Sequence, residues 1–185
     1  MQIGRKIIRL ESVDSTNNYT ANLLKAGELT NGTVILADEQ FAGRGQRGSE
    51  WLVKPGENLT FTVYLESVNL SVQNQFYLNC YISVTLIDLL KRMGLSAKIK
   101  WPNDIYIGEK KIAGILVENQ LQGEFIKSSI IGIGLNVNQL EFDQLNATSV
   151  KKELNVHFDV MDVLLRFIDQ FNKDSNPFGN FETLK

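Results

Sequence analysis

The sequence predicts an α+β domain built on a mixed, largely antiparallel β-sheet that is flanked by helices. Strand-like segments crowd together between residues 97 and 138 and are separated by short turn signals, which indicates hairpins. Strands and helices do not alternate regularly, so the doubly wound arrangement of a dinucleotide-binding fold is not expected. The length of 185 residues is enough for one domain with a sizeable core.

The N-terminal third predicts three strands and a helix. Its strand-like segments are rich in β-branched and apolar residues and are expected at 6–11, 33–40 and 58–66. Either Asp14 or Ser15 can cap the helix that follows the first strand, and Gly27 stands near its end. The expected apolar face of this helix consists of Tyr19, Leu23 and Leu24.

A longer helix is predicted over residues 72–93, with Ser71 as its N-cap and Gly94 after its end. Asn74 stands where a capping box would need Glu or Gln, so a full box is absent. The apolar stripe expected to face the core is Val72, Phe76, Cys80, Val84, Ile87 and Leu90. Two further helical patterns lie near 147–154 and 160–172.

The strands expected between these helices are 97–101, 104–108, 111–120 and 124–138. Turn signals at Gly108-Glu109 and Gln122-Gly123 predict antiparallel hairpins. The segments IAGILV and IIGIGL are apolar at both odd and even positions, so both faces of these strands should be covered.

The bulk composition excludes several classes of protein. The net charge of −2 gives no overall attraction to nucleic acid or anionic membranes. The single cysteine, Cys80, excludes a disulfide scaffold and fits a reducing compartment. No signal peptide and no membrane span is apparent, so we expect a cytoplasmic protein.

The segment GRGQRG, residues 43–48, is basic and flexible in an otherwise mildly acidic chain. Glycine-rich loops can turn backbone N–H groups toward an anion, and Arg44 and Arg47 can bind carboxylate or phosphate oxygens. Trp51 adds a flat surface on which a purine could stack. The segment lacks the Lys-Ser/Thr pair of a P-loop, and no helix pattern follows it directly. On composition alone, a solvated surface loop is an equally good interpretation.

A second cluster, KWPND at 100–104 and KKIAGILVE at 110–118, favours a binding site. Asn103 and Asp104 stand at the start of a strand. Because neighbouring side chains in a strand face opposite ways, one of Lys110 and Lys111 can point into a pocket beside Gly114. An anionic ligand would explain a lysine at the start of so apolar a strand.

These clusters resemble the catalytic domain of the biotin–protein ligases. The matching segments, in the order of that family, are DSTN (14–17), EQFAGRGQRG (39–48), KWPNDIY (100–106), KKIAGILVE (110–118) and IGIGLNVN (131–138). The resemblance implies a fold related to class II aminoacyl-tRNA synthetases. It also implies activation of biotin by MgATP to biotinyl-5′-AMP, and transfer to one lysine of a biotin carboxyl carrier protein.

The resemblance also implies roles for individual residues. Biotin contacts are expected from Ser15, Thr16, Asn17, Gln40, Arg44, Gly45, Gln46, Lys111, Gly114 and Leu116. Contacts to ATP or the adenylate are expected from Gly43, Arg44, Gln46, Arg47, Trp51, Asn103, Asp104, Lys111 and Asn136. Lys111 and Arg44 are the catalytic candidates, because fixed cations stabilise the charge that builds on an attacked phosphoryl group. No metal ligands are predicted, and Mg²⁺ would be held mostly by phosphate oxygens and water.

No nucleophilic side chain is needed, because the carboxylate of biotin attacks the phosphate itself. His157 is therefore expected at the surface and Cys80 in the core. Closure of the basic loop would exclude water from the mixed anhydride.

The sequence departs from the family pattern at two places. Gln46 stands where relatives often have arginine, which removes one charge from the loop. We also expect one catalytic domain over residues 1–185, without the usual small C-terminal β domain and without the N-terminal helix-turn-helix of some relatives. No binding to operator DNA is therefore predicted.

Two alternatives remain open. One is a lipoate–protein ligase, which shares the fold and the adenylate chemistry. The other is a binding module for biotin or nucleotide that has lost turnover. The sequence leaves open which carboxylase supplies the acceptor and whether the protein forms a homodimer.

Overall fold

The computed structural model describes residues 2–66, 68, 70–143 and 145–173, so residues 174–185 of the expected domain lie outside the described part. Its helices are α1 (Thr16–Ala26), α2 (Phe76–Arg92), α3 (Val150–Leu154) and α4 (Val160–Phe171). Its strands are β1 (Ile7–Val13), β2 (Val34–Gln40), β3 (Leu59–Glu66), β4 (Lys98–Lys100), β5 (Asp104–Ile107), β6 (Lys110–Gln122) and β7 (Phe125–Leu135).

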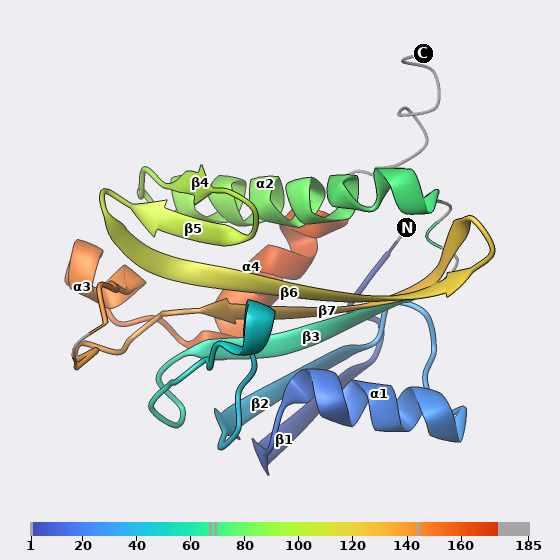
Figure 1. Ribbon diagram of the computed structural model, residues 1–185. Coiled ribbons are helices and arrows are strands. Elements are labelled where there is room, and N and C mark those ends of the chain that lie inside the picture. Colours follow the sequence, from blue (N-terminus) through green and yellow to red (C-terminus); the bar gives the residue numbers. More distant parts are fainter. Residues whose placement is uncertain (1, 67, 69, 144, 174–185) are drawn as a thin grey trace.

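The strands form one seven-stranded sheet in the order β1-β2-β3-β7-β6-β5-β4 (Figure 1). Among the strands of the described residues, only β1 and β2 pair in parallel, because α1 carries the chain back between them, and the other five pairings are antiparallel. The predicted α+β class and the predicted hairpins from β5 to β6 and from β6 to β7 are therefore confirmed.

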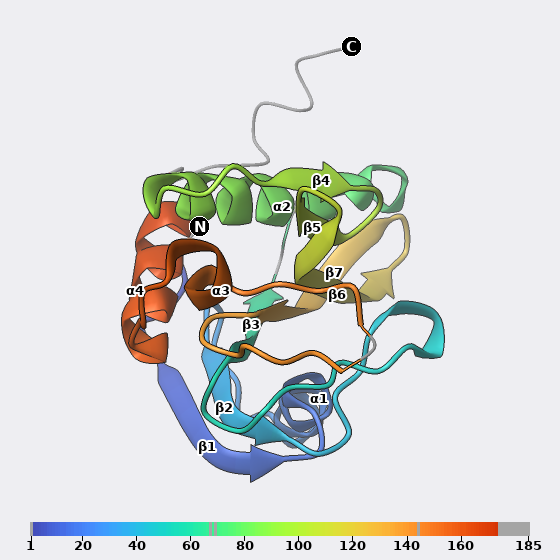
Figure 2. The ribbon, with the colours of Figure 1, turned by 90° about the vertical axis from the view of Figure 1, so that its left-hand side faces the viewer.

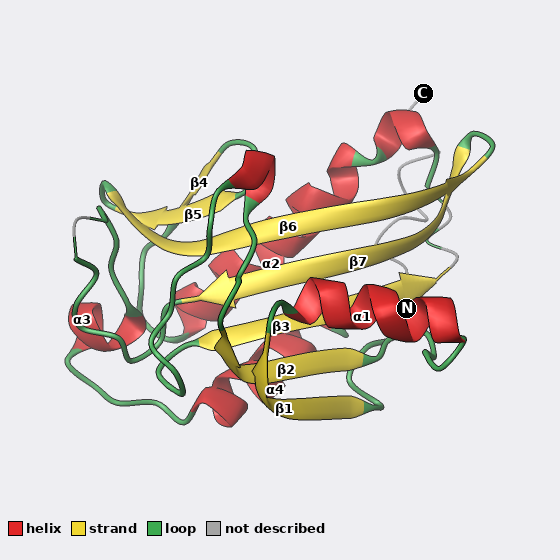
Figure 3. Ribbon diagram, turned by 60° about the horizontal axis from the view of Figure 1, so that its bottom comes forward, coloured by secondary structure: helices red, strands yellow, loops and turns green. Residues whose placement is uncertain are grey.

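The helices are divided between the two faces of the sheet. Helix α1 lies on one face, and α2 and α4 lie on the other (Figure 3). Figure 2 shows the sheet from its end, with β1 and β2 curving away below α4. The main core fills the space between the sheet and the α2–α4 pair, where the rings of Phe61 and Phe167 meet at a centroid distance of 5.1 Å.

Helix α2 differs from its prediction in its start and in the face it buries. The chain forms a short 3₁₀ turn over Val72–Asn74, and the helix begins only at Phe76, without a side-chain cap from Ser71. Its buried apolar residues are Leu78, Ile82, Leu86, Leu89 and Leu90. Of the expected stripe, Leu90 is buried, whereas Phe76 and Val84 are exposed.

Helix α1 also buries a different face from the one expected. Ser15 occupies the N-cap position, but its side chain makes no capping bond, and Gly27 ends the helix in the left-handed conformation. The residues that α1 buries are the polar Thr16, Asn17 and Thr20, while Tyr19, Leu23 and Leu24 are only partly buried. Buried polar side chains need hydrogen-bond partners, so the contact between α1 and the sheet contains a polar network in place of a hydrophobic core.

Among the described residues, no helix combines the length and the apolar character needed to cross a membrane.

Candidate active site

A pocket of about 390 Å³ lies on the face of the sheet that carries α1. The start of α1, the loop between β2 and β3, the turn over residues 101–103 and the strands β3, β5, β6 and β7 all contribute to it. Its walls therefore come from segments that are far apart in the sequence.

The floor of the pocket is glycine backbone. Gly134 of β7 pairs with Gly114 of β6 on one side and with Thr60 of β3 on the other. In the next row, Gly132 lies between Thr62 and Leu116. Because the floor carries no side chains at these glycines, a ligand or an aromatic ring can approach the sheet closely.

The indole ring of Trp51 lies directly against this glycine floor. A Cβ atom added to Gly134 would clash with its indole ring, and one added to Gly114 would lie 3.4 Å from that ring. The Lys111 ammonium lies 5.5 Å from the centre of the indole. The tryptophan therefore packs on the glycine floor beside a cation, as a wall against which a flat ligand could stack.

The basic loop returns on itself and brings its side chains to the mouth of the pocket. The N–H group of Trp51 donates to Gly43 O at 2.9 Å, and that of Gly45 donates to Ser49 O at 2.7 Å. Between them, Gln46–Gly48 form a 3₁₀ turn in which Arg47 has a φ of 54°. The Gly45 amide is thus used inside the loop, so the predicted anion cradle depends on the arginine side chains more than on this N–H group.

A β-bulge aims Lys111 into the pocket. Asp104 pairs with Gly114, but Tyr106 pairs with Lys111, so β6 carries one extra residue between these pairs. Bulges of this kind re-aim side chains next to functional sites. The Lys111 Nζ atom lies 2.8 Å from Asp104 Oδ1, and Lys110 is exposed on the outside. The prediction that one of the two lysines enters the pocket beside Gly114 is confirmed.

Polar side chains from α1 and two strands meet at the other end of the pocket. The N–H group and the hydroxyl of Thr16 both donate to Gln40 Oε1, at 2.7 and 2.9 Å. The Thr62 hydroxyl lies within hydrogen-bond distance of Thr16 Oγ1 and Asn17 Oδ1. Gln40 therefore takes the place of a capping side chain at the start of α1, and the network holds several donors and acceptors at fixed positions.

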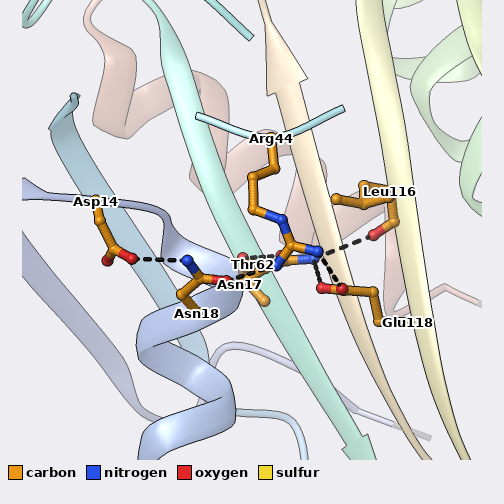
Figure 4. Close-up of polar contacts among 7 residues, drawn as sticks. All are labelled: Asp14, Asn17, Asn18, Arg44, Thr62, Leu116 and Glu118. Atoms are coloured by element: carbon orange, nitrogen blue, oxygen red, sulfur yellow. Dashed lines mark hydrogen bonds and ion pairs between the residues drawn. The ribbon is translucent and has the colours of Figure 1, made fainter. Parts of the chain in front are cut away.

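Arg44 spans the mouth of the pocket (Figure 4). One of its terminal nitrogens donates to Asn18 Oδ1 on α1, and the other donates to Glu118 Oε1 on β6 at 2.7 Å. Asn18 is held in turn by its own bond to Asp14 Oδ2, at 2.6 Å. The basic loop is thus tied to both sides of the pocket.

Three buried polar atoms of the pocket make no hydrogen bond among the described residues. They are Trp51 Nε1, Thr60 Oγ1 and Asp104 Oδ1, and of these Asp104 Oδ1 has an ion-pair partner in Lys111. Buried donors and acceptors are nearly always paired in proteins, so unpaired ones at a pocket wall are suited to a polar ligand. Within the same described part of the chain, no three His, Cys, Asp or Glu residues gather in a way that could hold a metal ion.

The structure brings almost all of the expected site residues to this pocket. Those that line it are Ser15, Thr16, Asn17, Gln40, Arg44, Gly45, Gln46, Arg47, Trp51, Asn103, Asp104, Lys111, Gly114 and Leu116. Gly43 is set back from the pocket, where it pairs with Trp51. Asn136 is also outside it, because it is buried and its amide donates to Thr148 O at 2.9 Å.

Sequence reasoning missed several residues of the site. Gly132, Gly134 and Thr60 belong to its floor, and Thr62 and Glu118 hold other site residues in place. The period of two along each strand could have found them, since Leu116 and Glu118 follow Gly114 on the same face and Gly134 follows Gly132.

Comparisons with known proteins agree with this arrangement. The family model described as the biotin/lipoate A/B protein ligase family matches residues 10–136. The bifunctional ligase/repressor BirA of Bacillus subtilis is 35% identical over 138 residues, covering 74% of this chain and 42% of the relative. A biotin–[acetyl-CoA-carboxylase] ligase of Paracoccus denitrificans is 37% identical over 131 residues, covering 69% of this chain and 53% of the relative.

A solved structure of the biotin protein ligase of Aquifex aeolicus in complex with biotin and ATP superposes with a TM-score of 0.79 and 29% sequence identity. The superposition covers 98% of this chain and 74% of that one. The chain thus spans about half or less of the two curated relatives, and about three quarters of this solved one. The resemblance to the catalytic domain of biotin–protein ligases is confirmed, and the chain belongs to the biotin/lipoate A/B protein ligase family.

Proposed function

We propose that this protein activates biotin with MgATP to biotinyl-5′-AMP and pyrophosphate, and then transfers biotin to a lysine of a biotin carboxyl carrier protein. The observation that carries the proposal is the pocket itself. It places two cationic side chains, Lys111 and Arg44, and an aromatic wall, Trp51, over a floor of glycine backbone. The Aquifex protein of similar fold binds biotin and ATP, which supports the same ligands here.

The first step joins two anions. A carboxylate oxygen of biotin attacks the α-phosphorus of ATP, and the bond from that phosphorus to the bridging oxygen of pyrophosphate breaks. Negative charge builds on the α-phosphoryl oxygens, and preorganised cations stabilise it. Lys111 is suited to this task, because the bulge directs it into the pocket and the backbone of residues 146–148 holds its main chain in place.

The second step needs an acceptor amine at the same mouth. The lysine nitrogen of the carrier attacks the acyl carbon of the adenylate, the acyl–phosphate bond breaks with AMP as the leaving group, and the amine loses a proton. Asp104 would be suited to help hold the Mg²⁺ of MgATP during the first step, since this ion takes one or two protein carboxylates beside phosphate oxygens, and the ion would supply positive charge to the phosphates.

The polar end of the pocket supports recognition of a compact polar head group. Thr16, Asn17 and Gln40 line this end of the pocket with hydroxyl and amide groups beside Gly132, where there is no side chain, and the buried Thr62 hydroxyl holds Thr16 and Asn17 in place. The ureido ring of biotin carries both N–H donors and a carbonyl acceptor, whereas the dithiolane of lipoate offers neither. This contrast favours biotin over lipoate.

Incubation with biotin, MgATP and a carrier domain, followed by intact mass measurement, tests the proposal. A mass gain of one biotin on the carrier, with pyrophosphate released, is the expected result. A parallel incubation with lipoate should give no product, and a lipoylated carrier would reassign the substrate. Tight biotin binding without pyrophosphate release would indicate a binding module instead.

A further inference from the structure

Glu118 ends the segment KKIAGILVE, and the resemblance leaves it without a role. It lies on β6, on the same face as Gly114 and Leu116. Its two carboxylate oxygens accept hydrogen bonds from two different segments of the site. One oxygen accepts from Arg44 at 2.7 Å, and the other accepts from Asn17 Nδ2 at 2.8 Å (Figure 4). A single side chain thus contacts both the basic loop and the start of α1.

The contact with Asn17 fixes the orientation of an amide. An ionised carboxylate only accepts hydrogen bonds, so the NH₂ end of Asn17 must face Glu118. The carbonyl end then faces Thr62 Oγ1, at 2.7 Å, and lies against Gly132. Asn17 is 2% exposed, so its amide cannot turn to water to satisfy itself. Asn17 Nδ2 also faces the Leu116 carbonyl, at the longer distance of 3.5 Å, so the carboxylate at 2.8 Å is the closer of the two acceptors that set the orientation of this amide.

The contact with Arg44 holds down the loop. Glu118 and Asn18 bind the two terminal nitrogens of Arg44 from opposite sides of the pocket mouth. The side chains of Arg44 and Glu118 are 45% and 37% exposed, so this pair can open and close without breaking the core. Of the two arginines in the loop, only Arg44 has such an anchor among the described residues.

We infer that Glu118 is a positioning residue of this site, which sets the amide orientation of Asn17 and anchors Arg44 over the pocket. The inference deepens the proposed function and rests on it for the identity of the ligand. It makes Glu118 act through two residues that line the pocket, and not by touching the reacting atoms.

Two substitutions separate the two contacts. In Glu118→Gln, the side chain keeps one acceptor end for two donors, Arg44 and Asn17. We expect the amide oxygen to accept from Arg44, because a hydrogen bond to a charged group is the stronger one, so that the NH₂ end meets the NH₂ end of Asn17. Two donors cannot pair, so the Asn17 amide is forced to turn over while the loop stays anchored. In Glu118→Ala, both contacts are lost. A matched control is Asp162→Asn, which removes a somewhat more exposed arginine–carboxylate ion pair, Arg166–Asp162, on α4 and so on the opposite side of the sheet.

The experiment combines steady-state adenylation with limited trypsin digestion. We expect Glu118→Gln to raise the KM for biotin about tenfold with little change in kcat, because a buried polar contact to the ligand is reversed. Trypsin cleavage after Arg44 should stay near the wild-type rate in this variant. In Glu118→Ala the KM should rise as well, and cleavage after Arg44 should become several-fold faster, because cleavage follows the population of the open loop. Asp162→Asn should leave both readouts unchanged.

Three results would overturn the inference. One is an unchanged KM in both Glu118 variants. Another is unchanged cleavage after Arg44 in Glu118→Ala. The last is a loss of kcat and melting temperature in Glu118→Gln with an unchanged KM, which would make the residue merely structural. If the wild-type protein forms no biotinyl adenylate, the proposed function fails by itself, and the cleavage rates still decide whether Glu118 anchors Arg44.

Discussion

Lys111 and Asp104 form an ion pair of 2.8 Å inside the pocket, between two strands that are joined by the turn at Gly108. Their side chains are 31% and 22% exposed, so the pair is neither fully solvated nor fully buried. The carboxylate thus offsets the charge of the cation that the proposed adenylation requires. A phosphate group that enters the pocket competes with Asp104 for this lysine.

Lys111→Ala should reduce adenylation by about 2–4 kcal/mol in transition-state free energy, because one preorganised cation is lost at the developing charge. Pyrophosphate release measured over a range of biotin and ATP concentrations tests this. Lys110→Ala is the control, since its side chain is exposed on the neighbouring position. Near wild-type adenylation in Lys111→Ala would remove the lysine from the mechanism.

Trp51→Ala should weaken ATP binding by about 1–3 kcal/mol and leave biotin binding much less affected, because a stacking surface for the base is lost. Calorimetric titrations with each ligand separate the two effects. Trp51→Phe keeps an aromatic face and should retain most of the affinity. Equal ATP affinity in the alanine variant and the wild type would count against stacking on this ring.

Gly134→Ala should displace the Trp51 indole, because the added methyl group would occupy the position of the ring. We expect weaker ATP binding and a shift in tryptophan fluorescence, while the fold persists. Gly114→Ala places its methyl 3.4 Å from the same ring and should have a smaller effect. An ordering of the two variants opposite to this one would show that the ring does not rest on the floor in solution.

Gln46→Arg should slow the escape of biotinyl-5′-AMP by restoring a charge to the loop beside the pocket. The gain is expected to be about 1 kcal/mol or less, because partly exposed ion pairs contribute little. Rapid filtration of the preformed complex gives the dissociation rate. A dissociation rate equal to that of the wild type would mean that residue 46 does not reach the adenylate.

Burial raises the pKa of the Cys80 thiol above its ordinary value. The thiolate is the reactive form, so the folded protein should contain less of it than the unfolded chain at any given pH near that value. Alkylation by iodoacetamide should therefore reach its half-maximal rate at a higher pH in the native protein than in urea. Coincident pH profiles in the two conditions would contradict this.

The positions of the strands along the chain and two of the hairpins could be predicted from the sequence, because they depend on local patterns. Gly108 and Gly123 both adopt positive φ, which glycine accepts without strain, so the glycines in the sequence predicted the positions of these two hairpin turns. The parallel pairing of β1 with β2 was not visible, since it depends on how α1 packs across the sheet.

The buried face of α2 could not be read in the same way. Apolar residues lie almost all around this helix, and both the series through Phe76 and Val84 and the series through Leu78 and Ile82 have a spacing of four. Only the position of α4 and of the sheet decides which series is covered. Phe76, on the uncovered side, instead lies near Trp101, with ring centroids 6.2 Å apart.

The site was predictable where a motif carried it and less so where tertiary contacts did. Lys111 and Arg44 stand in segments of unusual composition, and this composition was enough to predict them as site residues. Glu118 is one acidic residue among many in the sequence, and only its contacts with Asn17 and Arg44 in the folded protein connect it to the site. Asn136 has the polar character of a ligand contact, but its amide serves the backbone of residue 148.

The glycine floor joins β3, β6 and β7, which enter the sheet from segments between residues 59 and 135. A fragment that lacks any one of these three strands cannot assemble this surface. A small molecule that occupies it therefore binds the native state and not the unfolded one, and by mass action it raises the melting temperature of the entire domain. If biotin is that small molecule, as proposed, the stability of the domain should rise with the logarithm of the biotin concentration above the dissociation constant.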